Sequence, residues 1–162
     1  MRRLPAAAIA LGVGGLIPFL ALTVGILFFP AEVPVPRLTA ALMGYGAVIL
    51  SFLGAVHWGL ALRGLPGNAV AGPRGEGRAM WTALGLGVVP ALVGWAALLS
   101  ATVADPVVGF LLLLAGFVGT IVVERRAAAA GWMPPGYLVL RYLLTAVVAV
   151  CLVAAVVGRL AG

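Results

Sequence analysis

Residues 106–123 read PVVGFLLLLAGFVGTIVV, a run without a single charged side chain. At about 1.5 Å of rise per residue, a helix of this length nearly crosses a hydrocarbon core of about 30 Å. The run lacks the polar–apolar alternation of a barrel strand, and a segment in lipid must satisfy its own backbone hydrogen bonds. We therefore expect a transmembrane helix here.

Four further apolar runs resemble it, at about 4–29, 38–62, 80–99 and 136–158. Hydrophobic residues make up 64% of the chain and charged residues only 9%, whereas an average soluble domain is about a quarter charged. The composition predicts an all-α, polytopic transmembrane bundle of about five spans, with one transmembrane domain over residues 1–162 and a flexible Gly- and Pro-rich loop at 63–79.

The arginines predict the orientation of this bundle. With five spans, the amino terminus and the loops at 63–79 and 124–141 share one side of the membrane. That side holds Arg2, Arg3, Arg63, Arg74, Arg78, Arg125, Arg126 and Arg141, and the other side holds Arg37 and Arg159. Because basic residues concentrate in cytoplasmic loops, we expect a cytoplasmic amino terminus and a multipass protein of the cell inner membrane. The first run exceeds the apolar core of a signal peptide, about 7–15 residues, so we interpret it as an uncleaved span.

Small residues recur in the second span every four positions, at Ala47, Ser51, Ala55 and Gly59. Such spacing lets helix backbones approach closely. It predicts a face packed within the bundle, or alternatively an oligomer interface, and it leaves Leu50 and Leu53 toward lipid.

Two prolines fall in the middle of predicted spans, Pro18 in the first and Pro90 in the third. Each removes a helix hydrogen bond, so both are predicted to kink their helices. Both stand in a Gly-x-x-Pro pattern, which is either a trace of an internal repeat or a coincidence.

The candidate functional residues are His57, Trp58 and Arg141, the first two near one end of the second span. An ionisable group in a membrane is costly, so His57 could be a proton relay or an axial ligand of haem or a metal. The structural alternative is an interfacial side chain with one interhelical hydrogen bond. Arg141 either snorkels to the headgroups or contacts an anion.

The four carboxylates, Glu32, Glu76, Asp105 and Glu124, all fall in loops or at predicted span ends. We therefore expect Glu124-Arg125-Arg126 to be a solvated helix end and no carboxylate pair to converge in the membrane. Too few ligands accompany His57 for a metal site, and Cys151 is the only cysteine. The pattern predicts no catalytic residue, no cofactor, no metal and no enzyme activity. The arginines stand singly or in pairs at span ends, which argues against nucleic-acid binding.

Three segments together resemble a known family: 14–19 (GGLIPF), 45–60 (YGAVILSFLGAVHWGL) and 141–148 (RYLLTAVV). They resemble the transmembrane protein 69-like family, a group of small multipass proteins with a domain of unknown function. The resemblance implies a small integral membrane protein and brings no reaction or ligand.

Two functions follow as expectations. The first is a structural, accessory or assembly component whose partners are membrane lipids and other membrane-protein subunits. The alternative is a small transporter or channel subunit that uses His57 and the spans kinked at Pro18 and Pro90. An accessory subunit should expose a small-residue face, whereas a transporter should gather polar side chains inside the membrane.

The topology can be tested with reporter fusions. Phosphatase fused after Gly162 should be active and a fluorescent protein in the same place dark, because the carboxy terminus is expected outside. Fusions within loop 63–79 should behave the opposite way. A cytoplasmic carboxy terminus would contradict a five-span topology that begins in the cytoplasm.

Overall fold

A computed structural model of the chain describes residues 5–29, 34–63, 76–129 and 136–161, and within these ranges every regular element is a helix. The helices are α1 (Ala6–Gly14), α2 (Ile17–Phe28), α3 (Pro34–Arg63), α4 (Glu76–Val103), α5 (Pro106–Ala129) and α6 (Tyr137–Ala161). Helices α1 and α2 together form one span, and α3 to α6 are each long and apolar enough to form another. The predicted all-α bundle with five spans is confirmed, and its orientation stays a prediction.

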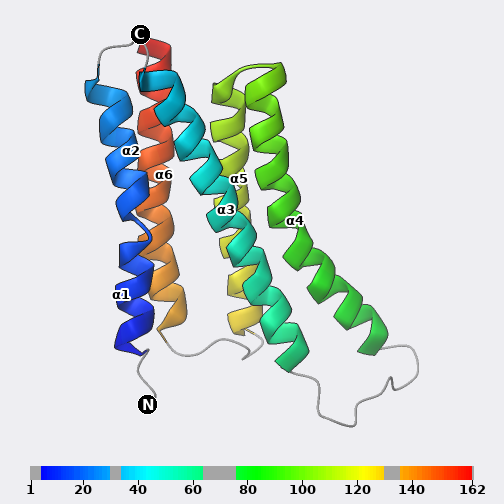
Figure 1. Ribbon diagram of the computed structural model, residues 1–162. Coiled ribbons are helices and arrows are strands. Elements are labelled where there is room, and N and C mark those ends of the chain that lie inside the picture. The colour runs from blue at the N-terminus through cyan, green and yellow to red at the C-terminus, as the bar shows by residue number, and fades with distance from the viewer. Residues whose placement is uncertain (1–4, 30–33, 64–75, 130–135, 162) are drawn as a thin grey trace.

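The five spans run side by side in an up-and-down arrangement (Figure 1). Helix α3 packs against α2, α4 and α5, and α5 packs in turn against α4 and α6. Helix α2 also packs against α6. Large buried side chains on four of the helices fill the interior, namely Phe19, Leu42, Met43, Leu50, Phe110, Leu113, Phe117 and Leu152.

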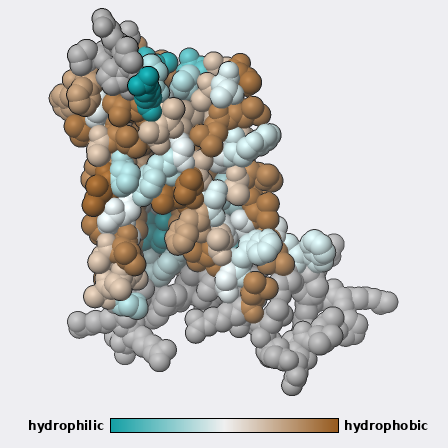
Figure 2. Space-filling model, viewed as in Figure 1, coloured by the Kyte–Doolittle hydropathy of each residue, from teal (hydrophilic) through white to brown (hydrophobic). Residues whose placement is uncertain are grey.

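On the face that Figure 2 shows, brown and tan apolar residues cover much of the surface, with paler residues between them. Phe28 and Trp81 are 80% and 81% exposed, and large aliphatic side chains are exposed on every helix. Water would penalise so much contiguous apolar surface, whereas hydrocarbon does not. The exterior is therefore suited to lipid.

The first span is broken rather than merely kinked. Helix α1 ends at Gly14, and Pro18 lies in the first turn of α2, where its missing N–H costs no helix hydrogen bond. The Tyr45 hydroxyl of α3 donates a hydrogen bond of 2.9 Å to the Gly15 carbonyl at this break. The Tyr45 ring also meets Phe19 edge to face at 5.1 Å between centroids. Tyr45 thus holds the junction of α1 and α2.

Helix α4 continues through Pro90. Figure 1 shows its amino-terminal part leaning away from the bundle. A proline inside a helix lacks the N–H for one backbone bond and displaces the preceding turn, which favours such a bend.

The closest approach of the α3 and α4 backbones is made by small residues. A Cβ atom on Gly94 would lie 3.1 Å from the Ala47 Cα atom, and a Cβ on Gly54 would overlap the carbonyl group of Gly87. The two backbones therefore approach closely, as small residues allow in membrane helices.

Only part of the predicted packing face of α3 is buried. Ala47 is buried and Ser51 partly so, but Ala55 and Gly59 are exposed. Leu50 and Leu53, expected at the lipid, are instead buried in the core. The four-residue spacing explains the error, because a helix turns about 100° per residue and each such step drifts about 40° around the axis.

Glycine substitutions on α3 test this geometry. Gly54→Ala should destabilise the protein by about 1–3 kcal/mol, because its methyl group meets the α4 backbone. Gly44→Ala on the same helix is the matched control, since no described atom lies within 4 Å of a Cβ there. It should be silent or slightly stabilising, as Ala is the better helix former. Equal losses of thermal stability in detergent would contradict the close α3–α4 contact.

Candidate functional site

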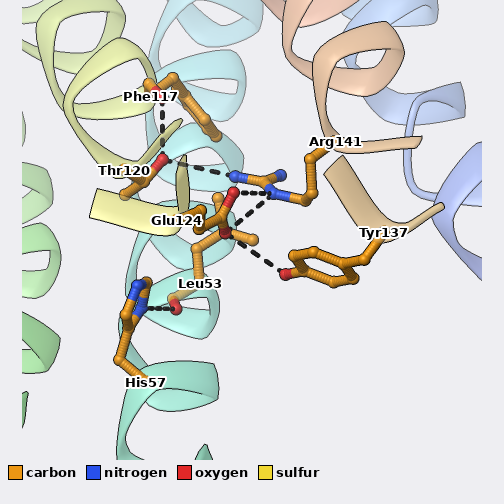
Figure 3. A network of polar contacts seen from close by, with 7 residues as sticks. All are labelled: Leu53, His57, Phe117, Thr120, Glu124, Tyr137 and Arg141. Carbon is orange, nitrogen blue, oxygen red and sulfur yellow. Dashed lines mark hydrogen bonds and ion pairs between the residues drawn. The ribbon is translucent and has the colours of Figure 1, made fainter. Parts of the chain in front are cut away.

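An ion pair lies inside the membrane-spanning part of the bundle. Helix α5 continues to Ala129, beyond the predicted end at Val123, so Glu124 lies within it and is fully buried. The Arg141 Nε atom on α6 donates to both carboxylate oxygens, at 3.0 Å to Oε1 and 2.8 Å to Oε2 (Figure 3). Arg141 is only 6% exposed.

Two predictions were therefore wrong. Glu124 is not at a solvated helix end, and Arg141 does not extend to the headgroups but turns inward to Glu124. An isolated charge in the hydrocarbon core is costly, and the cost falls when opposite charges pair with good hydrogen-bond geometry. Direct pairing thus replaces hydration for both groups.

Two more side chains bond to the pair. The Tyr137 hydroxyl donates to Glu124 Oε1 at 3.3 Å, and Arg141 Nη2 donates to the Thr120 hydroxyl oxygen at 3.3 Å. Thr120 in turn donates to the Phe117 carbonyl within α5 at 2.8 Å. We call Thr120, Glu124, Tyr137 and Arg141 the polar cluster. It joins α5 to α6 through side chains alone.

His57 lies on α3, is 8% exposed and has one hydrogen bond. Its Nδ1 atom lies 3.1 Å from the Leu53 carbonyl oxygen (Figure 3). A carbonyl oxygen can only accept, so Nδ1 donates this hydrogen bond and carries a proton. The Nε2 atom is buried and has no hydrogen-bond partner in the described part of the chain.

Trp58 bonds to α4, whereas its neighbour His57 bonds within α3. Its indole Nε1 donates to the Leu84 carbonyl oxygen at 2.9 Å, and the ring fills the space beside Gly87. Trp58 therefore fastens α3 to α4. Of the three candidate residues, only Arg141 belongs to the polar cluster.

The chemistry of the cluster is that of a closed ion pair. Glu124 and Arg141 cancel in charge, and the carboxylate accepts from two neighbouring side chains. Among the described residues, no group of three or more His, Cys, Asp or Glu lies together as a metal site would require. The ion pair and its hydrogen bonds hold α5 and α6 together.

The sequence analysis missed Glu124, Tyr137 and Thr120 as site residues. A usable signal existed, because Glu124 lies five residues before the end of α5 and Arg141 four residues after the start of α6. Antiparallel neighbours joined by a short connection bring such positions to the same depth. Opposite charges at matching depths in adjacent spans thus predict a pair.

Comparisons with known proteins assign nearly the whole chain to one family. The model of a family described as a protein of unknown function (DUF3429) matches residues 4–157. Transmembrane protein 69 of Xenopus tropicalis is 41% identical over 95 residues, which cover 59% of this chain and 33% of that protein. The chain thus matches about a third of the length of this relative. No solved structure matches. The resemblance found in the sequence is confirmed.

Substitutions at the ion pair test its role. Glu124→Leu or Arg141→Met alone should destabilise the protein by about 3–5 kcal/mol, because each leaves one buried charge unpaired. The double variant removes both charges and should recover most of that loss. The measurement is unfolding in detergent followed by circular dichroism. A double variant as unstable as the sum of the two single variants would show that the two charges do not depend on each other.

Proposed function

This chain belongs to the DUF3429 family and is a multipass membrane protein, and we propose that it is a structural or assembly component that packs against other subunits of a membrane complex. The proposal includes the cell inner membrane as its location. Its partners would be membrane lipids and the transmembrane helices of those subunits.

The observation that carries this proposal is an uncovered face on α3 with three small residues, Gly44, Ala55 and Gly59, and the larger Val48. These positions fall within about 60° of one another around the helix, at about 100° per residue. No described atom lies within 4 Å of the place that a Cβ would take on Gly44 or Gly59, and Val48 and Ala55 are exposed. Small residues at lipid contribute little to the chain itself, but they let a second helix approach closely.

The interior supports the same function. The charged groups of the polar cluster are bonded to each other, and this fixes α5 against α6. A bundle braced in this way presents a defined outer surface, as a scaffold or accessory subunit needs. The surface face on α3 is then the part that a partner would recognise.

A small transporter or channel subunit is the second candidate. The observation that favours it is the buried cluster of ionisable groups, together with the unpartnered Nε2 atom of His57. The break before Pro18 and the bend around Pro90 would give such a protein places to move. A His57→Gln variant separates the two candidates, since loss of a cellular phenotype without loss of stability would favour transport.

Replacing small residues of this α3 face with leucine tests the assembly function. Gly59→Leu and Ala55→Leu should leave the stability of the purified chain within about 0.5 kcal/mol, because both sites are exposed. Each should reduce recovery of a complex of defined mass after mild detergent extraction, because the larger side chain blocks close helix approach.

Val150→Leu, at an exposed site on α6, is the control and should leave the complex intact. The assembly function would be contradicted if the native chain runs as a bare monomer, or if all three variants retain the same complex.

A further inference from the structure

Helices α3 and α5 run in parallel with a constant register. Met43 contacts Gly109, Gly46 contacts Leu113, and Leu50 contacts Gly116. The paired numbers differ by 66, 67 and 66, so the same register places position 57 level with positions 123 and 124. His57 therefore lies at the depth of Glu124.

Both residues also lie on buried faces of their helices, in line with residues that make these contacts. On α3 this face runs through Gly46, Leu50, Leu53 and His57, and all four are buried. On α5 the matching face runs through Leu113, Phe117, Thr120 and Glu124, which are buried as well. Two apolar faces thus end in a polar residue at the same level. Figure 3 draws His57 and Leu53 on α3 beside the cluster residues of α5 and α6.

We propose that His57 and Glu124 form a binding site for one small, neutral hydrogen-bond donor, a water molecule, which bridges the imidazole Nε2 atom and the carboxylate. The site extends the polar cluster from α5 and α6 to α3. It concerns the interior of the bundle and does not depend on the partner proposed for the α3 surface.

The free atoms of the site determine the kind of ligand. The Nε2 atom is an acceptor, because the ring proton is on Nδ1 and points to the Leu53 carbonyl. Within the described ranges Glu124 Oε2 accepts from Arg141 alone, whereas a carboxylate oxygen can accept about two hydrogen bonds. Both free positions are acceptors, so the ligand must donate twice. Water has two O–H groups and is small enough for a buried polar site.

The balanced charges of Glu124 and Arg141 favour water over a cation as the ligand of this site. Glu124 and Arg141 already cancel, so an ammonium ion would add an unpaired positive charge beside the guanidinium. A bound water adds no charge and gives the Nε2 atom the donor that a buried acceptor needs. It also connects the imidazole to the carboxylate through hydrogen bonds.

The single histidine makes the test direct. The full chain, labelled with ¹⁵N in its histidine ring and placed in lipid nanodiscs, gives one imidazole signal set by NMR. The expected result is a proton on Nδ1, a bare Nε2 with the shift of a hydrogen-bonded acceptor, and magnetisation transfer from water to the ring. A proton on Nε2, or an Nε2 shift of a free acceptor without transfer from water, would overturn the site. A change of the signal on adding ammonium chloride would overturn the neutral ligand.

Two variants test the partner of His57. Glu124→Gln should move the Nε2 signal, because it changes the group that the ligand bridges. Asp105→Asn, at the exposed start of α5, is the matched control and should leave the signal in place. An unchanged signal in a folded Glu124→Gln protein would overturn the pairing with Glu124. The measurement on the native chain decides the presence of the ligand without either variant.

Discussion

The ion pair of Glu124 and Arg141 is the interaction on which the arrangement of the last two spans depends. In lipid, apolar side chains gain little by turning inward, because the acyl chains are as apolar as the core. A charged side chain behaves differently, because it loses the free energy of its hydration in lipid unless an opposite charge pairs with it. In the depth and rotation that α5 and α6 adopt, Arg141 reaches Glu124 Oε2 at 2.8 Å, which satisfies both charges. Tyr137 then donates to Glu124 Oε1, and Thr120 accepts from Arg141 Nη2.

The fold class followed from the sequence because hydrophobic length is a local property. Five long apolar runs, of which only the last contains a charged residue, Arg141, predict five helices without any knowledge of distant contacts. The polar cluster is not local. Glu124 stands beside Arg125 and Arg126, which are exposed, and this neighbourhood suggested a solvated end. Its burial depends on α6 lying opposite, and only the comparison of depths across the 130–135 connection could have revealed it.

The packing face of α3 shows a second reason why sequence patterns mislead. A repeat of four residues is close to one helical turn but not equal to it, so Ala47 and Gly59 lie about 120° apart. Ala47 consequently meets Gly94 of α4, whereas Gly59 faces outward. The rows that do pack follow steps of three and four in alternation, as in Gly46, Leu50, Leu53 and His57. A small residue therefore identifies a possible contact, and the rotation around the axis decides whether the contact lies inside the chain.

The same principles explain why α1 is the least constrained described helix. None of its residues is buried, and it packs lightly against α6, where Gly12 lies near Leu144. It has neither a buried charge nor a close backbone contact with α3. What ties it to the bundle is the continuation into α2, whose first turn is fastened by Phe19 and Tyr45. Because Pro18 cannot donate to Gly14, the chain breaks there at little cost, and Tyr45 satisfies the next carbonyl. The break thus separates α2, which the aromatic packing of Phe19 and Tyr45 holds, from α1, whose position depends mainly on its connection to α2.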